Sequence, residues 1–401
     1  MILKNGIICD KEQEFKGDVR VENGVIQEVS PSIEPRKGEE VRDISGKYLM
    51  PSIVDLNITV KNQNLTTKSL QEVSNLAMKS GVSTVAINPN VTPKIDNESV
   101  VDLIQTKLKY NKNIINMLPI ASSVSNGKLN NISILIKAGC KAIGFQSKHN
   151  SAIALKVLEY ASLLNVPVLI NALDVSLKGQ GVMNDGVVAS KLGLGGISEI
   201  SEYADVAKLV KIASAVEAKV IFKNISSPKS IEIINRAKAD GLDIKSEVSI
   251  HHLILDDSAC DNYNTYAKIE PPLRSSESVQ DLREKLKNGE IDLLTSLQSD
   301  VSNTKKDLAF DDAMNGMSVL KHYFALAYTS LVKENLISLQ KLSQMVSYEP
   351  SMIIGLTKQG LVKEGFKARL MVVDTEAKST ITGVSPYSGM EVFGAVELLK
   401  F

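Results

Sequence analysis

Short runs of β-branched and other apolar residues alternate with helix-length stretches along most of the chain. Eight runs are expected to form strands, at residues 52–58, 83–89, 116–122, 141–145, 166–172, 219–225, 244–250 and 292–298. Between them, stretches such as 151–165 place apolar residues at spacings of three and four, which predicts a helix with one buried face. Alternating strands and helices predict a parallel sheet, and eight strands favour a closed (β/α)8 TIM barrel of the α/β class. An open doubly wound sheet remains the alternative.

Both ends of the chain show a different pattern. Residues 1–50 contain short strand patterns joined by Asn-Gly and Ser-Gly turns, and residues 361–376 have the pattern of another hairpin. Neither end is long enough to bury a core of its own. We therefore expect residues 1–50 and 358–401 to form one composite β-sandwich domain, and residues 51–357 to form the barrel domain.

Composition narrows the range of partners. The chain has 46 Lys plus Arg against 46 Asp plus Glu, so its formal net charge is zero, and it has no tryptophan. These features argue against a nucleic-acid-binding surface. The cysteines Cys9, Cys140 and Cys260 are far apart and form no CxxC motif, so neither a disulfide framework nor a zinc ribbon is indicated. No signal-peptide layout and no long apolar run are present, so we expect a cytoplasmic protein that does not enter a membrane.

Five segments, in order along the chain, carry a family likeness. They are PSIVDLNITV (51–60), SGVSTVAINPNVTP (80–93), GQGVMNDGVVASKLGLGGIS (179–198), AKADGLDIKSEVSIHHLIL (237–255) and KIEPPLRS (268–275). These segments resemble motifs of dihydroorotases, members of the amidohydrolase superfamily, and the likeness covers nearly the whole chain. The resemblance implies a (β/α)8 barrel with a composite β domain. It also implies a pocket at the carboxyl ends of the strands, where the family opens or closes a cyclic amide with a zinc-activated water.

The positions that correspond to the family's metal ligands carry residues that bind zinc poorly. They are Asn57, Thr59, Asn171, Asn224 and Leu297. The bridging acid or carboxylated lysine of the family falls near Phe145 and Gln146. Zinc in proteins takes thiolate, imidazole or carboxylate ligands. Leu297 stands where the family has an aspartate that binds metal and carries a proton, and leucine can do neither. We therefore expect no zinc, no other cofactor and no catalytic residue.

Part of the family's substrate pocket remains. Asn90 matches the asparagine that contacts the substrate carboxylate. Lys61 stands in place of an arginine and keeps its charge without the planar fork of a guanidinium. Glu270 stands in place of an asparagine, and its charge would oppose an anionic ligand. By this comparison the pocket is partly dismantled as a binding site.

The four histidines add no metal site to this picture. His251 and His252 follow the seventh strand in a family motif that lies outside the zinc shell. His149 is expected in a solvated loop near the former metal site. His322 lies in an apolar helical pattern, where a packing role is expected.

These replacements lead us to expect a protein that is not an enzyme. By the resemblance, it would be an inactive dihydroorotase homologue that acts as a structural or regulatory partner of the aspartate transcarbamoylase catalytic chain in de novo pyrimidine biosynthesis. Homo-oligomer formation is also left open. The alternative is a divergent metal-independent hydrolase or a small-anion binder that uses the polar residues left in the pocket, with Asp300 among them.

Overall fold

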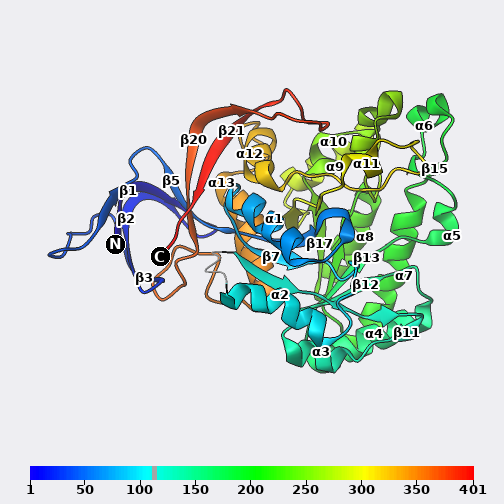
Figure 1. Cartoon of the computed structure of the whole chain (residues 1–401), viewed down its shortest axis with the longest axis horizontal. Coiled ribbons are helices and arrows are strands. Elements are labelled where there is room, and N and C mark those ends of the chain that lie inside the picture. Colours follow the sequence, from blue (N-terminus) through cyan, green and yellow to red (C-terminus); the bar gives the residue numbers. More distant parts are fainter. Residues whose placement is uncertain (111–114) are drawn as a thin grey trace.

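The computed structural model describes residues 1–110 and 115–401, with a ring of parallel strands on one side and a twisted sheet on the other (Figure 1). The ring is made of β6 (Ile53–Thr59), β7 (Val82–Ile87), β8 (Asn116–Pro119), β9 (Ala121–Ser122), β12 (Ile143–Gln146), β13 (Val168–Asn171), β16 (Val220–Lys223), β17 (Ile244–Ser249), β18 (Leu293–Thr295) and β19 (Gln298–Ser299). The strands pair in two arcs, β19-β6-β7-β8 and β9-β12-β13-β16-β17-β18. The chain passes almost directly from β8 to β9 and from β18 to β19, so the two arcs join at both ends. Each of the eight predicted runs supplies one strand position, and the predicted barrel is confirmed.

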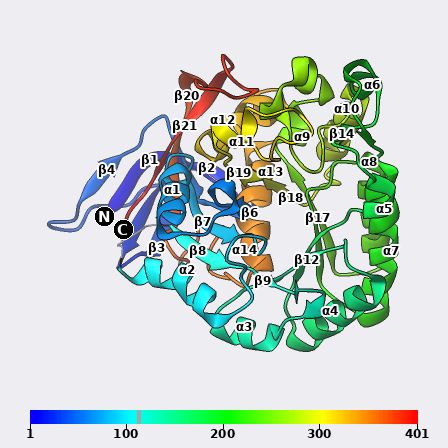
Figure 2. The ribbon, with the colours of Figure 1, turned by 45° about the vertical axis from the view of Figure 1, so that its right-hand side comes forward.

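Helices cover the outside of the ring (Figure 2). The α-helices are α1 (Thr67–Met78), α2 (Glu98–Tyr110), α3 (Ile132–Ala138), α4 (Ser151–Leu164), α5 (Val175–Lys178), α6 (Val187–Leu192), α7 (Ile200–Val216), α8 (Pro228–Ala239), α9 (His251–Ile254), α10 (Ser276–Lys287), α11 (Asn303–Lys306), α12 (Tyr323–Ala327), α13 (Leu339–Ser343) and α14 (Glu349–Ile353). Short 3-10 or π-helical turns complete them: η1 (Lys61–Gln63), η2 (Asp257–Tyr263), η3 (Thr265–Ala267), η4 (Leu320–His322), η5 (Tyr328–Val332) and η6 (Gln344–Tyr348). Side-chain caps fix several helix starts. For example, the side chain of Asn150 accepts a hydrogen bond from the backbone N–H of Ile153 at the start of α4.

An apolar layer inside the ring lies beneath a more polar one. The apolar layer includes Ala86, Ala142, Leu169 and Ile221. Side chains alternate along a strand, so the residue two positions further along points into the ring one layer higher. Those residues are Asn88, Gly144, Asn171 and Lys223. The more polar layer therefore lies at the carboxyl ends of the strands, where active sites of (β/α)8 barrels are found.

The second sheet combines strands from both ends of the chain. Its strands are β1 (Ile2–Cys9), β2 (Glu14–Glu22), β3 (Val25–Ser30), β4 (Val41–Asp43), β5 (Tyr48–Pro51), β20 (Leu370–Thr380) and β21 (Glu391–Leu398). The order is β21-β20-β5-β1-β2-β3, with β4 paired to β1. Antiparallel pairing of β20 with β5 brings Leu370 opposite Pro51, next to the start of β6. The two termini consequently lie close together (Figure 1). Separate two-stranded pairs are formed by β10 (Val124–Ser125) with β11 (Lys128–Leu129), and by β14 (Met183–Asn184) with β15 (Gly196–Ile197).

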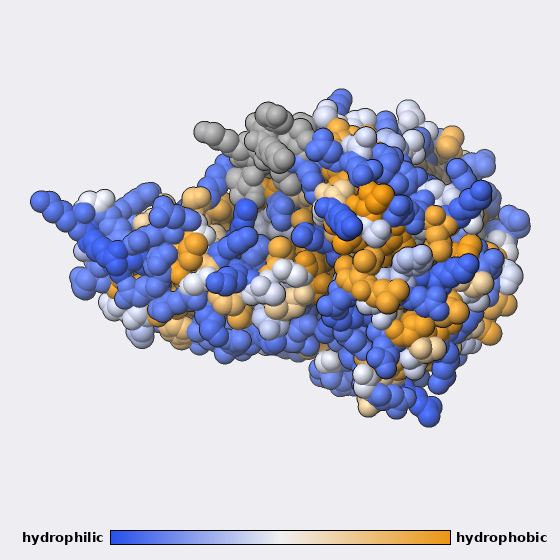
Figure 3. All heavy atoms as spheres, turned by 90° about the horizontal axis from the view of Figure 1, so that it is seen from below, coloured by the Kyte–Doolittle hydropathy of each residue, from blue (hydrophilic) through white to orange (hydrophobic). Residues whose placement is uncertain are grey.

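The molecular surface mixes polar and apolar groups. Figure 3 shows apolar side chains in patches over the barrel half of one face, with hydrophilic side chains between them, and a mainly hydrophilic tip on the sheet half. Exposed apolar residues include Tyr160 and Leu163 on α4. Among the described residues, no helix is both long and apolar enough to span a membrane.

Two buried histidines lie at the start of α9. The Nδ1 atom of His251 lies 2.9 Å from the hydroxyl of Tyr387, and Nδ1 of His252 lies 2.8 Å from the hydroxyl of Ser249. The Nε2 atom of His252 is 3.2 Å from the carbonyl oxygen of Pro271. Burial is the largest cause that lowers both pKa values, to about 3 for His251 and about 4 for His252. Both rings are therefore neutral at physiological pH and have a structural role.

These two histidines predict a loss of stability in mild acid. The unfolded chain takes up protons near pH 6.5 while the folded chain does not, so the free energy of unfolding falls as pH drops from 6.5 toward 4. The slope is up to about 1.4 kcal/mol per pH unit for each histidine. Urea unfolding at a series of pH values measures it. His251→Phe should lower the slope by one histidine's share, and an unchanged slope would contradict the assignment.

Candidate active site

A cavity of about 180 Å³ opens at the carboxyl ends of the barrel strands. It is lined by all five positions that the resemblance assigns to metal ligands: Asn57, Thr59, Asn171, Asn224 and Leu297. Two of them lie on irregular backbone, since Asn224 has a φ of 56° and Leu297 a φ of 48°. Leu297 lies in the short link between β18 and β19. The structure thus brings these sequence-predicted positions together in one place.

A lysine that the motif comparison missed lines the same cavity. Lys223 ends β16 and is only 5 % exposed. It lies two residues after Ile221, so the alternation of the strand directs its side chain into the ring. This alternation of inward and outward side chains is a signal in the sequence that could have identified Lys223. The motif comparison pointed instead to its neighbour, Asn224.

Lys223 is connected to a buried carboxylate through two asparagines. Its Nζ donates to Oδ1 of Asn88 at 2.6 Å. The Nδ2 of Asn88 donates to Oδ1 of Asn57 at 2.8 Å and to the hydroxyl of Thr59 at 3.0 Å. The Nδ2 of Asn57 donates to Oε1 of Glu247 at 2.8 Å. Four barrel strands thereby contribute to one polar cluster, and its hydrogen bonds fix the side chain of Lys223.

Burial favours the neutral forms of Lys223 and Glu247 in this cluster. Desolvation lowers the pKa of Lys223, while the charges of Glu247 and Asp55 act in the opposite sense. Desolvation also raises the pKa of Glu247 to about 7, against the attraction of Lys223. A lysine with a lowered pKa can act as a base, which a fully solvated lysine cannot do near neutral pH.

The residues at the cavity do not fit zinc. Asn57 donates one hydrogen bond to Asn224 and receives one from Asn88, so these amides bind one another. The amine of Lys223 is a proton-binding group in the same cluster, and when protonated it repels a metal cation. Zinc requires thiolate, imidazole or carboxylate ligands. Within residues 1–110 and 115–401, no group of three or more His, Cys, Asp and Glu could hold a metal ion.

Of the three residues assigned to the remnant substrate pocket, two line the cavity and one does not. Asn90 and Glu270 line the cavity. Glu270 forms an ion pair with Lys178 at 2.5 Å, which offsets its negative charge at the cavity edge. Lys61 is not among the described residues that line the cavity. Its Nζ pairs with Oδ2 of Asp300 at 3.3 Å. The sequence did not indicate either ion pair.

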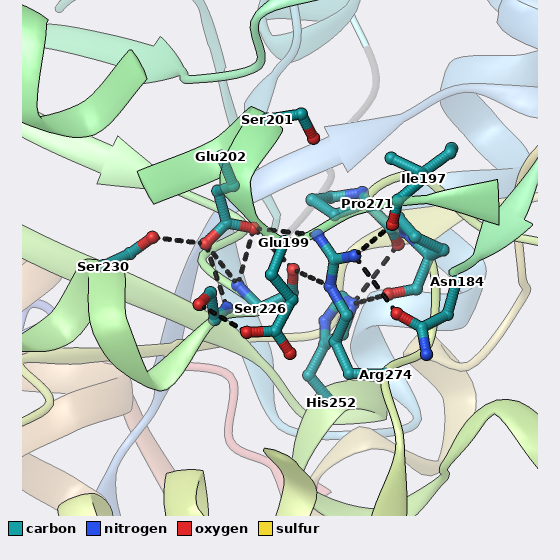
Figure 4. A network of polar contacts seen from close by, with 12 residues as sticks. Asn184, Ile197, Glu199, Ser201, Glu202, Ser226, Ser230, His252, Pro271 and Arg274 are labelled. Atoms are coloured by element: carbon teal, nitrogen blue, oxygen red, sulfur yellow. Dashed lines mark hydrogen bonds and ion pairs between the residues drawn. The ribbon is translucent and has the colours of Figure 1, made fainter. Parts of the chain in front are cut away.

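A buried arginine network supports the loop that follows Lys223 (Figure 4). Arg274 donates from Nε to the hydroxyl of Ser226 at 2.9 Å and from Nη1 to the carbonyl oxygen of Ile197 at 2.9 Å. Its Nη2 lies 3.7 Å from Oε2 of Glu202, and both side chains are 1 % exposed. Glu202 also accepts hydrogen bonds from the backbone N–H groups of Ser226 and Ser227. The arginine of the KIEPPLRS segment therefore holds loops in place rather than lining the cavity.

Comparison with known proteins identifies the family. A model described as "Dihydro-orotase-like" matches residues 46–230. Proteins named dihydroorotase from Trichlorobacter lovleyi and Geobacter metallireducens are 30% and 31% identical to this chain, and each alignment covers 98% of this chain and 96% of the relative. The chain belongs to the dihydroorotase family. A further dihydroorotase, from Carboxydothermus hydrogenoformans, is 32% identical over 93% of this chain and 88% of its own length.

Solved structures support the fold of this dihydroorotase family member. The D-hydantoinase (dihydropyrimidinase) from Thermus sp. has a TM-score of 0.86 at 19% identity and covers 98% of this chain and 92% of its own. The L-hydantoinase from Arthrobacter aurescens has a TM-score of 0.84 at 19% identity, with coverage of 98% and 93%. At this identity, the likeness shows the shared amidohydrolase barrel and carries no further argument.

The family assignment corrects two expectations. The chain was expected not to be an enzyme and to be an inactive partner of another enzyme, but relatives that match it over nearly its full length are named as dihydroorotases, which are enzymes. The expectation equated the loss of zinc ligands with the loss of catalysis. It did not consider Lys223, which lines the same cavity, or Glu247, which accepts a hydrogen bond from the cavity residue Asn57.

Proposed function

We propose that this protein is an enzyme of the dihydroorotase type that opens and closes a cyclic amide ring, with Lys223 as the proton carrier and without zinc. The observation that carries the proposal is the position of Lys223, a buried amine of lowered pKa that lines the cavity at the barrel mouth. Family membership supports the reaction class. The amide, hydroxyl and leucine side chains at the former metal positions are poor zinc ligands, which supports a reaction without a metal.

In ring opening, the unprotonated amine of Lys223 accepts a proton from water as the water oxygen bonds to the ring carbonyl carbon. The C–N bond of the tetrahedral intermediate then breaks. The ammonium of Lys223 returns the proton to the departing nitrogen, and the new carboxylic acid ionises. One water is consumed, and ring closure follows the same steps in reverse.

Neighbouring residues have positioning roles in this scheme. Asn88 holds Nζ of Lys223 at 2.6 Å, and Asn57 links Asn88 to Glu247. Asn171 lines the cavity, and its side-chain amide has no hydrogen-bond partner among the residues described. It is therefore available to donate to the carbonyl oxygen as negative charge develops there.

An assay on three cyclic amides tests the proposal. Dihydroorotate, dihydrouracil and hydantoin are offered to the full chain, and ring opening and closure are both followed. We expect turnover of at least one of them above that of a Lys223→Met protein prepared in parallel. If none of the three is turned over faster than by that variant, the proposal is wrong.

The same proposal predicts a low zinc content. Protein purified without a chelator should hold far less than one zinc per chain, because neutral amides, a hydroxyl and a leucine line the former ligand positions. Elemental analysis by mass spectrometry measures the ratio. A ratio near one that falls in Asn57→Ala or Asn171→Ala protein would show that these amides bind metal after all.

Association with the aspartate transcarbamoylase catalytic chain, and assembly into a homo-oligomer, stay predictions from the family resemblance. Both are compatible with an active enzyme, because neither requires the cavity at the barrel mouth.

A further inference from the structure

The outer face of α4 exposes more apolar surface than the outer faces of α8 and α10. On α4, Tyr160 is 50% exposed, Leu163 is 82% exposed and Leu155 is 37% exposed. By contrast, the exposed side chains of α10 are all polar, and those of α8 are Lys229, Glu232, Arg236 and Ala239. α4 lies on the lower side of the barrel in Figure 1, and Figure 3, which is seen from below, shows apolar patches over the barrel half. A contiguous apolar patch with polar residues around it is typical of a surface that binds another molecule.

The exposed residues of α4 form one stripe along the helix, which we call the α4 stripe. Positions i, i+3, i+4, i+7, i+8 and i+11 share a face of an α-helix. On α4 these positions are all exposed, and they are Ala152, Leu155, Lys156, Glu159, Tyr160 and Leu163. The opposite face is buried against the barrel and holds Ala154, Val157, Leu158 and Ala161. The helix therefore has apolar residues on both faces, and within one chain only the inner face is covered.

Opposite charges lie near the middle of the α4 stripe. Lys156 and Glu159 form no ion pair and no side-chain hydrogen bond with any residue in the described part of the chain. The hydroxyl of Tyr160 has no partner there either. These polar groups are consequently available to a molecule that binds on the outside of α4.

A second copy of the α4 stripe is complementary to the first when the two helices run antiparallel. A two-fold axis placed midway between Lys156 and Glu159 brings each of these charges opposite the other one in the second copy. The remaining positions then pair apolar with apolar: Leu155 with Tyr160, and Ala152 with Leu163. A shift of one helical turn would instead place Glu159 opposite Glu159, or Lys156 opposite Lys156. The charges thus fit a second copy of this chain in one register.

We propose that the α4 stripe is a dimer interface, and that its occupant is the same stripe of a second copy of this chain. α4 has 14 residues and is therefore about 21 Å long. A single pair of helices of this length buries less area than the about 1,600 Å² of a standard interface, so the dimer belongs to the weak, reversible class. We expect a dissociation constant on the order of 10 µM. The proposal does not depend on the reaction at Lys223.

Sedimentation velocity on the full chain measures the association. Between about 1 µM and about 300 µM, the chain should change from mainly monomer to mainly dimer. Leu163→Ser should raise the dissociation constant by about tenfold or more, because apolar area is lost on both copies. Leu308→Ser changes a leucine that is 50% exposed in the loop after α11 and should leave the constant within about twofold. A chain that stays monomeric at 300 µM, or equal effects of the two variants, would overturn the proposal.

Charge reversal tests the register. Lys156→Glu and Glu159→Lys should each raise the dissociation constant by about tenfold or more, because the two-fold axis turns each change into two like-charge contacts. Combining both changes in one chain should restore the dimer, and so should an equimolar mixture of the two single variants, since opposite charges then face each other again. Lys287→Glu makes the same change of charge on the exposed face of α10 and should have an effect within about twofold.

The variants give clear outcomes because all of these positions are exposed and leave the core unchanged. If both single charge variants associate as well as the unchanged chain, the dimer uses another surface and the proposal is wrong. If the combined variant and the mixture both stay monomeric, the antiparallel pairing is wrong and the proposal fails as well.

Discussion

Replacement of Lys223 by methionine is expected to lower kcat/KM for ring opening by at least about 100-fold, because proton transfer by a positioned side chain contributes about 10²- to 10⁴-fold. Methionine fills a similar volume in the buried position, but it removes the donor to Oδ1 of Asn88 and a cation near Glu247. The free energy of unfolding should therefore fall by about 1–3 kcal/mol, the usual cost of a buried acceptor left without its donor. Steady-state kinetics and urea unfolding on the same sample separate the two effects.

Two further variants define the role of Lys223. Lys223→Arg keeps a positive charge but cannot lose its proton in the accessible pH range, so it should be as inactive as Lys223→Met. Lys219→Met changes an exposed lysine just before the other end of β16 and should leave kcat/KM within about twofold. In the unchanged protein, kcat/KM should rise with pH as the amine of Lys223 loses its proton. Full activity in Lys223→Arg would mean that only the charge matters.

Replacement of Arg274 by methionine is expected to lower the free energy of unfolding by about 3–5 kcal/mol, the usual cost of removing one partner from a buried ion pair. Glu202 would keep a negative charge at 1 % exposure without its counter-ion. The hydroxyl of Ser226 and the carbonyl oxygen of Ile197 would each lose a donor. Urea unfolding measures the change.

An exposed arginine serves as the matched control. Arg36 pairs with Glu22, and its side chain is 62% exposed, so Arg36→Met should cost less than about 1 kcal/mol. If Arg274→Met destabilises the protein no more than Arg36→Met does, the network in Figure 4 has no special role in stability.

Much of the fold could be predicted because its signals are local. Each barrel strand is a short apolar run bounded by polar or turn residues, and the inward residues Leu169 and Ile221 follow from the period of two. The family likeness then indicated which strand ends carry the site. Asn57 and Asn171 accordingly lie together at the cavity, although they are far apart in the sequence.

The chemistry of the site was harder to predict because it depends on contacts between distant segments. Asn224 adopts a positive φ directly after Lys223, and both residues line the cavity. A regular strand would have turned one of them away, and the motif comparison selected Asn224 alone because it aligns with a histidine of the family. Likewise, Lys61 follows the first barrel strand, β6, and pairs with Asp300, which follows the last one, β19. Sequence spacing alone gives no indication of such a contact.

Turnover by metal-free protein tests the central claim most directly. The full chain is treated with a chelator and its zinc content is measured, and ring opening is assayed in the untreated chain, in the chelator-treated chain and after zinc is added back. The account predicts equal rates in all three samples, and the same loss of rate in Lys223→Met whether or not zinc is present. A rate that disappears with the chelator and returns in proportion to added zinc would contradict it.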